Sequence, residues 1–421
     1  MGVALLVIGL LGAVHAANAL APRKRPPVVF LWSFLSSWIT IELVWHHLVL
    51  GVVVTAFLVA RGALDQPAGV VGLIVMLGAL AALLHIAWTT RRTVLQVRGA
   101  LEDLEPGPEA PRFPRVQVVL PFLMGRRKGV HLRRNIAFGR IEGKTLRLDV
   151  TVPSAPVPGG GALRPALMQI HGGGWVIGDK REQGLPLLGH MAAQGWVGFN
   201  VNYRLSPGVA FPEHLIDLKR GLAWIREHAA EFGVDPEFIC VTGGSAGGHL
   251  TALMGLTQGE ARFQPGFESA DTTVAAAVPF YGIYDFTDGG AFGADPEIFR
   301  KFLEPVVMKA FLEEEPEKFR DASPIHHISA DAPPFLVIHG DRDTLAPVED
   351  ARTFVERLRE VSTRPVLYAE MQGAQHAFEV FPSVRSARVI EGVERFLTTL
   401  WERRHQPSEP SEPELEDALT D

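Results

Sequence analysis

The sequence is poor in the residues that build disulfide-bonded, metal-binding or strongly charged proteins. Its 421 residues include a single cysteine, Cys240, which allows no disulfide within the chain and no metal site built on cysteine pairs. The formal net charge is −7, and six acidic residues lie in the last thirteen positions. The rest of the chain is therefore close to neutral, and it lacks the basic field that nucleic-acid binding requires.

Long hydrophobic runs, by contrast, are plentiful at the N-terminal end. They cover residues 3–20, 28–60 and 69–88. A bilayer core about 30 Å thick is crossed by about 20 apolar helical residues, so the first and third runs have the length of a membrane span. The second run would measure about 50 Å as one straight helix, which is too long. We interpret its first half as interfacial or tilted, and we place its crossing nearer residues 40–60.

Polar residues around these runs indicate how the runs would lie in a membrane. Glu42, His46 and His47 would lie at or inside a membrane boundary, either as functional ionisable groups or as a polar ring or helix-pairing contact. A cleaved signal peptide and a soluble helical domain are the alternatives, but no basic residue precedes the first run and the runs have basic flanks. With three crossings, the basic residues 23–25 and 91–92 fall on one side. This predicts a multi-pass protein of the cell membrane with its C-terminal domain in the cytoplasm.

The remainder of the chain has the pattern of an α/β domain. A hairpin is expected around residues 142–144, and beyond it short apolar strands alternate with helical segments. The further expected strands cover residues 166–170, 197–203, 238–242, 275–279, 335–338 and 366–369. Such alternation predicts a mostly parallel central sheet with helices on both faces.

These patterns divide the chain into four parts. Residues 1–92 form the membrane region of three apolar helices, and residues 93–133 form a connector that is a candidate cap. Residues 134–405 form the α/β domain. Residues 406–421 form an acidic tail that is too polar to pack, and we expect it to be disordered.

The first motif with chemical content is GGSAGG, which begins at Gly243 directly after an expected strand. It is a G-x-S-x-G sequence in a strand–turn–helix setting. Gly243 and Gly247 let the backbone turn sharply, so that Ser245 would project its hydroxyl above the sheet. Alone, this pentapeptide is a weak signal, because a serine in a glycine turn is often structural.

The second motif is HGGGW, which begins at His171 and also follows an expected strand. Consecutive glycines allow backbone N–H groups to point into a cavity without obstruction by side chains. Such preplaced donors stabilise the charge that develops on a carbonyl oxygen during acyl transfer. We assign the N–H groups of Gly173, Gly174 and Ala246 to this oxyanion hole, with Gly172 in a supporting role. His171 is expected to fix the loop and not to act as a base.

The third motif is a pair of sites in the last part of the domain. A serine nucleophile needs a histidine to take its proton and a carboxylate to hold that histidine. The order Ser245, Asp343, His376 is the order found in α/β-hydrolases. Asp341 is the competing acid; we favour Asp343 and expect a structural role for Asp341. The adjacent histidines 326–327 come without a metal-binding pattern, so we predict no metal and no other cofactor.

These motifs together resemble the hormone-sensitive-lipase-like family of α/β-hydrolase esterases, over residues from about 134 to 401. The resemblance rests on HGGGW at 171–175, NYRL at 202–205, FP at 211–212 with Asp217, FGVDP at 232–236, GGSAGG at 243–248, Asp343 and His376. It implies an α/β-hydrolase fold and a triad of Ser245, Asp343 and His376 that hydrolyses carboxylic esters through an acyl-enzyme. It also implies that Tyr203-Arg204 and Asp217 are scaffold residues. The front half resembles membrane-anchored actinobacterial lipase/esterases and, more distantly, isoprenylcysteine methylesterases.

The expected substrate is a small-molecule or lipid ester, because a membrane anchor favours an apolar substrate. An insertion after the strand 275–279 carries many apolar residues and would be either a lid that forms an acyl pocket or ordinary packing. An amidase or acyltransferase on the same site is one alternative function. The other is a non-catalytic ligand-binding protein similar to the gibberellin receptors, which lack the catalytic histidine that His376 would supply here.

Overall fold

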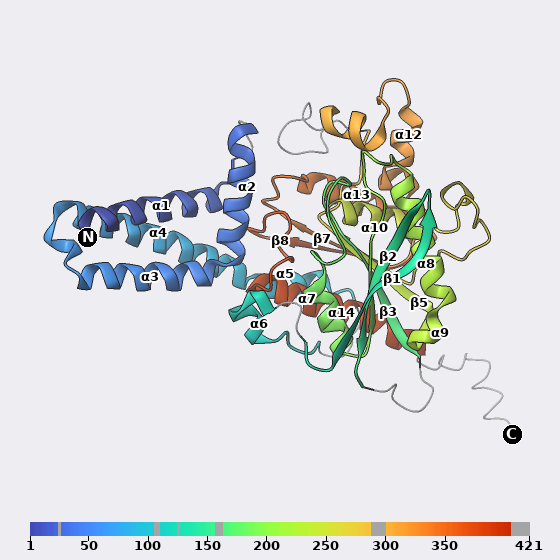
Figure 1. Cartoon of the computed structure of the whole chain (residues 1–421), viewed down its shortest axis with the longest axis horizontal. Helices are drawn as coiled ribbons and strands as arrows, with labels where there is room; N and C mark the ends of the chain where they lie inside the picture. Colours follow the sequence, from blue (N-terminus) through green and yellow to red (C-terminus); the bar gives the residue numbers. More distant parts are fainter. Residues whose placement is uncertain (24–26, 105–109, 124–126, 156–162, 288–299, 406–421) are drawn as a thin grey trace.

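The computed structural model describes residues 1–23, 27–104, 110–123, 127–155, 163–287 and 300–405. Its chain forms a group of long helices that extends to one side of an α/β domain (Figure 1). The predicted tail, 406–421, lies outside the described residues.

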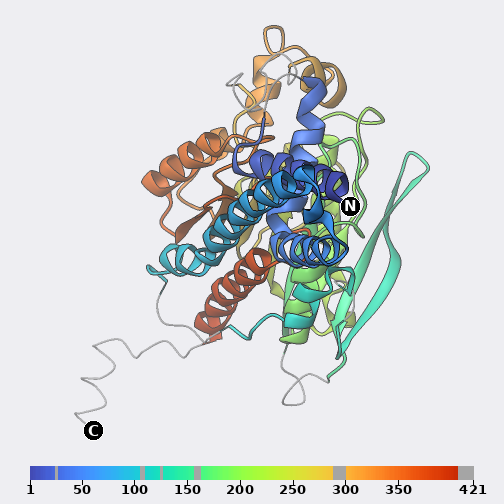
Figure 2. The same ribbon diagram turned by 90° about the vertical axis from the view of Figure 1, so that its left-hand side faces the viewer.

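The helical region consists of three long helices side by side and a fourth across their ends (Figures 1 and 2). These helices are α1 (Gly2–Leu20), α2 (Pro27–Glu42), α3 (Val44–Ala60) and α4 (Pro67–Arg91). α1 packs closely on α4 because glycines meet there: a Cβ added to Gly9 would lie 2.8 Å from the carbonyl oxygen of Gly72.

Among the described residues, two helical segments, Gly2–Leu20 and Pro67–Ala100, are long and apolar enough to cross a membrane, and a third candidate is the bent pair α2–α3 if it counts as one span. The pair is bent by 85°, so the long second run of the sequence is two helices. The bend falls at Leu43, close to the predicted start of the crossing segment. α2 lies across the end of the group, against the α/β domain (Figure 1).

The α/β domain is built on one eight-stranded sheet with the order β1-β2-β4-β3-β5-β6-β7-β8. The strands are β1 (Val130–Ile141), β2 (Lys144–Pro153), β3 (Arg164–Ile170), β4 (Val197–Val201), β5 (Val234–Gly244), β6 (Ala277–Phe280), β7 (Phe335–Gly340) and β8 (Val366–Met371). The pairs β1–β2 and β2–β4 are antiparallel, and all the other pairs are parallel. This confirms the predicted hairpin and the mostly parallel sheet.

Successive strand residues point to opposite sides of the sheet, so the apolar strands place apolar side chains on both faces. Helices cover both of these faces. In β3, Met168 faces one hydrophobic core and Leu167 faces the other. The first face is covered by α8 (Glu213–Glu227), α10 (Ala246–Leu256) and α13 (Val348–Val361). The second face is covered by α7 (Leu185–Ala193) and α14 (Val384–His405). Shorter helices are α5 (Thr93–Ala100), α6 (Arg115–Val119), α9 (Ala229–Phe232) and α12 (Pro316–Asp321).

The connector 93–133 packs against the α/β domain. Leu101, Leu104 and Phe113 are buried in the core beneath α14. Part of the insertion after β6 also packs inward, since Leu303, Val307 and Met308 are buried in the other core, whereas Phe311 is half exposed. Its residues 288–299 lie outside the described residues.

Candidate active site

Ser245 lies at the tight turn between β5 and α10, in a conformation that is rare for a residue with a side chain (φ 60°, ψ −124°). The flanking glycines are required by a close approach of the chain. A Cβ on Gly243 would lie 2.5 Å from the carbonyl oxygen of Ile170, and one on Gly247 would lie 2.2 Å from the same atom. The two glycines therefore let the serine turn sit directly against the end of β3.

The HGGGW loop packs against this turn and presents backbone donors. The N–H of Gly172 is used, since it donates to Gln183 Oε1 at 2.7 Å. Among the described residues, no acceptor is hydrogen-bonded to the N–H groups of Gly173 or Gly174. Ala246 is the first residue of α10, where an N–H has no partner within the helix. Within the described parts of the chain, none of the three predicted oxyanion donors thus has a hydrogen-bond partner.

His171 holds this loop from behind. Its Nδ1 lies 2.8 Å from the carbonyl oxygen of Gly172, and its ring stacks on Tyr203 at 4.5 Å. The Tyr203 hydroxyl donates to the carbonyl oxygen of His171. Arg204 in turn is fixed by hydrogen bonds to both carboxylate oxygens of Asp217, at 2.8 and 2.9 Å. These contacts are those of a scaffold.

Asp343 and His376 meet where their loops leave β7 and β8. His376 Nδ1 lies 2.6 Å from Asp343 Oδ2, and both side chains are buried. The other carboxylate oxygen accepts the N–H groups of Leu345 and Ala346 at 2.7 and 2.8 Å. Burial by itself raises the pKa of Asp343. The charge of His376 and the hydrogen bonds from His339 and His376 together lower this pKa by more than burial raises it, so the pKa lies well below its usual range. The carboxylate is therefore held ionised beside the imidazole.

Asp341, the competing acid, has a different partner. Its Oδ1 accepts the N–H of Gly373 at 2.6 Å, which joins the two loops after β7 and β8. The structure brings Asp343 to His376 and gives Asp341 this loop contact.

Ser245, His376, Gly173 and Gly174 line one cavity of about 440 Å³. The other lining residues are mostly apolar or aromatic: Phe34, Trp38, Trp175, Ile177, Glu182, Gln183, Tyr281, Ile283, Leu345, Ala346, Ala377 and Val380. Among the described residues, Ser245 Oγ has no hydrogen-bond partner, so its hydroxyl is available to a ligand. Within the described part of 93–133, no residue lines this cavity, whereas Phe34 and Trp38 of α2 do.

The sequence did not predict that α2 forms one wall of this cavity; it suggested only an interfacial or tilted helix. Trp38 donates its indole N–H to the carbonyl oxygen of Ala377 at 2.9 Å. The Phe34 ring lies edge-on to the His376 ring at 6.3 Å. Ser37 Oγ accepts from Gln375 Nε2 at 3.1 Å. The helical region therefore contacts the residues on both sides of His376.

A buried ion pair fastens the end of α2 to the α/β domain. Glu42 Oε1 lies 3.1 Å from Arg385 Nε, and both side chains are fully buried. Ser383 donates to the other Glu42 oxygen at 2.7 Å, and Arg385 also donates to the carbonyl oxygen of Gln372 at 2.8 Å. Of the roles considered for Glu42, the structure shows a pairing contact, made with α14 of the other domain.

Comparison with known proteins places this geometry in a family. Residues 148–358, half of the chain, match the BD-FAE family. The probable carboxylic ester hydrolase LipM of Mycobacterium tuberculosis is 39% identical over 96% of this chain and 95% of its own length. Esterase LipC of the same organism is 40% identical over 76% of this chain and 77% of its own length.

Among solved structures, a thermophilic esterase from Thermogutta terrifontis with bound propionate has a TM-score of 0.54 and 25% identity, over 64% of this chain and 94% of that chain. The domain thus has the α/β-hydrolase fold. The chain belongs to the BD-FAE family, within the hormone-sensitive-lipase-like esterases, and is a carboxylic ester hydrolase.

Proposed function

We propose that this hydrolase cleaves carboxylic esters by two-step acyl transfer on Ser245, with His376 as general base and Asp343 as its carboxylate partner. The observation that carries the proposal is the 2.6 Å contact between Asp343 and His376, with the imidazole in the wall of the same cavity as Ser245. In this scheme the N–H groups of Gly173, Gly174 and Ala246 form the oxyanion hole.

The proposed steps follow from this arrangement. His376 takes the proton of Ser245 as its oxygen attacks the ester carbonyl, and the free N–H groups stabilise the oxyanion. His376, now protonated and facing the ionised Asp343, gives the proton to the leaving alcohol. Water then attacks the acyl-enzyme with His376 as base, which releases the acid and restores Ser245.

An ester with an apolar acyl or alcohol group is the substrate class that this cavity supports. Its walls include Phe34, Trp38, Ile177 and Val380. Two of these residues belong to α2, so the substrate would lie beside the helical region. The names of the relatives favour ester hydrolysis over amide hydrolysis, acyl transfer to an alcohol or ligand binding without catalysis.

We also propose that residues 1–92 anchor the protein in the cell membrane with several passes, and that the domain 134–405 lies in the cytoplasm. The length and apolarity of the spans support the anchor, and the basic residues at 23–25 and 91–92 support the orientation. The substrate would then reach the cavity at the membrane surface, along α2.

The test is a series of p-nitrophenyl esters, acetyl to palmitoyl, with the full-length chain and Ser245→Ala. We expect the substitution to lower kcat by on the order of 10⁴–10⁶. Ser362→Ala, at a half-buried position directly after α13 and outside the cavity, is the matched control and should leave kcat unchanged. Turnover that persists in Ser245→Ala would contradict the assignment of the nucleophile.

A further inference from the structure

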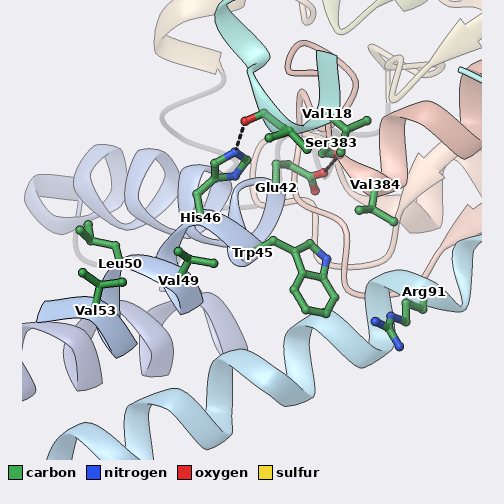
Figure 3. Close-up of a pocket in the computed structure, with 11 residues that line it drawn as sticks. Glu42, Trp45, His46, Val49, Leu50, Val53, Arg91, Val118, Ser383 and Val384 are labelled. Atoms are coloured by element: carbon green, nitrogen blue, oxygen red, sulfur yellow. Dashed lines mark hydrogen bonds between the residues drawn. The ribbon is translucent and has the colours of Figure 1, made fainter. Parts of the chain in front are cut away.

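A second cavity of about 690 Å³ lies where the helical region meets the α/β domain (Figure 3). It shares no lining residue with the Ser245 cavity. Its lining residues are Glu42, Trp45, His46, Val49, Leu50, Val53, Arg91, Val118, Val119, Ser383 and Val384. They come from the end of α2, from α3, from the end of α4, from α6 and from the start of α14 with the residue before it, so both parts of the molecule build the cavity.

The long wall of this cavity is apolar and continues onto the outer face of α3. Val49, Leu50 and Val53 are each more than half exposed. α6 forms the opposite wall, and it is held there by a contact of 2.9 Å between His46 Nε2 and the carbonyl oxygen of Val119. From Trp45 to Val53 the helix rises about 12 Å, enough for a large part of one acyl chain. The cavity is therefore an apolar groove that opens sideways from a membrane helix.

The charges in the groove do not balance. The charge of the Glu42 carboxylate is balanced by Arg385 at one oxygen, and Ser383 donates a hydrogen bond to the other oxygen. Arg91 has its guanidinium over the Trp45 ring, 5.0 Å from the centroid. Among the described residues, no carboxylate forms an ion pair with Arg91. The unbalanced charge of the groove is thus positive, and it lies at the polar end of α4.

We propose that this groove binds one acyl chain of an anionic phospholipid, with the lipid phosphate on Arg91. Basic pockets between membrane helices bind anionic headgroups, and a chain along α3 would cover the exposed valine and leucine side chains. The inference rests on the proposed membrane placement of α3 and α4, and it is independent of the proposed triad. A bound lipid would contact Glu42 and Ser383, which fasten α2 to the catalytic domain.

The experiment titrates the full-length protein in detergent micelles with dioleoyl phosphatidylglycerol, dioleoyl phosphatidylcholine or oleate, and counts bound molecules by native mass spectrometry. Val49→Trp fills the groove from α3, and Val118→Trp fills it from α6. Val52→Trp is the matched control, since Val52 is exposed on α3 outside the groove. Turnover of p-nitrophenyl acetate shows that each variant is folded.

The charge is tested with Arg91→Gln. Arg92→Gln is its control, because Arg92 is the next residue, is stacked on Trp88 and does not line the groove. We expect native protein to prefer phosphatidylglycerol, the groove-filling variants to bind it at least ten-fold more weakly, and Arg91→Gln to lose about five-fold. Both controls should bind as the native protein does.

Three results would overturn the proposal. Equal affinity for the two phospholipids would show that the site does not select an anionic headgroup. Native affinity in Val49→Trp and Val118→Trp would show that the lipid does not bind in the groove. Tighter binding of oleate than of phosphatidylglycerol would make a free fatty acid the occupant. Ser245→Ala should bind lipid as the native chain does, so a failure of the triad would leave this result unchanged.

Discussion

The helical region and the α/β domain contain similar apolar residues, but the domain buries them and the helical region exposes many of them. In the domain, strand residues such as Leu167 and Met168 are fully buried. In the helical region, Val49 and Ile74 are 64% and 65% exposed. A surface so rich in exposed apolar side chains needs an apolar environment, whereas the domain packs its apolar side chains into its own core.

The helical region also buries polar groups between its helices. Asn18 and Ser33 are buried between α1 and α2 and exchange hydrogen bonds of 2.6 and 2.8 Å. Nearby, His15 Nδ1 lies 2.7 Å from Ser36 Oγ. The comparison teaches that the helical region is held together by small apolar clusters together with buried polar contacts, and that α2 packs both on the other helices and on the α/β domain. The following experiments test that division, in order of expected effect.

The largest effect is expected within the α/β domain. Asp343→Asn should lower kcat by about 10⁴, because the amide cannot hold His376 as the carboxylate does. Asp341→Asn is the matched control, and we expect only a small change, since Asp341 contacts the backbone of Gly373. Steady-state kinetics on p-nitrophenyl butyrate measure both. A large loss in Asp341→Asn with a native rate in Asp343→Asn would exchange the two roles.

The next largest effect is expected at the joint between the two regions. Arg385→Met leaves the buried carboxylate of Glu42 without its partner and should destabilise the protein by roughly 3–5 kcal/mol. Adding Glu42→Leu should recover much of this loss, because no charge is then left buried. Thermal unfolding in detergent measures both variants. Glu349→Leu removes an exposed ion pair with Arg352 and should change little.

The contribution of α2 to specificity is expected to be smaller. Trp38→Ala should lower kcat/KM for octanoyl and longer esters by about ten-fold, and affect the acetyl ester less, because it removes an apolar wall of the cavity. Trp32→Ala, on the same helix but exposed, is the control. A uniform loss across all chain lengths would mean that Trp38 positions His376 and does not contact the chain.

The smallest effect concerns pH. Burial raises the pKa of Glu379 from 4.5 to about 7; the hydrogen bond from Tyr281 opposes this and the charge of Glu42 adds to it. Because the folded state binds this proton more tightly than the unfolded state, stability should fall as the pH rises from 4.5 to 7 and then level off.

Glu379→Gln removes this titration and keeps an acceptor for Tyr281. Its melting temperature relative to the native protein should therefore be a few degrees higher at pH 8 than at pH 5. Glu356→Gln, at an exposed position of α13, should show the same relative melting temperature at both pH values. Equal behaviour of the two variants would contradict a raised pKa in Glu379.

Much of the α/β domain could be predicted because its signals are local. Apolar strands, breaker residues and the glycine motifs each occupy a few consecutive positions, and the alternation of strands with helices predicts parallel pairing. The order of the strands, in which β4 lies between β2 and β3, was not predicted. The sequence placed Ser245, Asp343 and His376 after three of the expected strands, those at 238–242, 335–338 and 366–369. Their roles as a triad stay a prediction until the variants are measured.

The sequence by itself determined the alternation of strands and helices, the serine turn, the glycine loop and the length of the apolar runs, because each depends on neighbours in the chain. Only the tertiary structure decided what closes the cavity at Ser245. Glu42 and Arg385 are 343 positions apart, and Trp38 and Ala377 are 339 apart. Pairings at such separations depend on how whole domains pack, and no local pattern of residues encodes them.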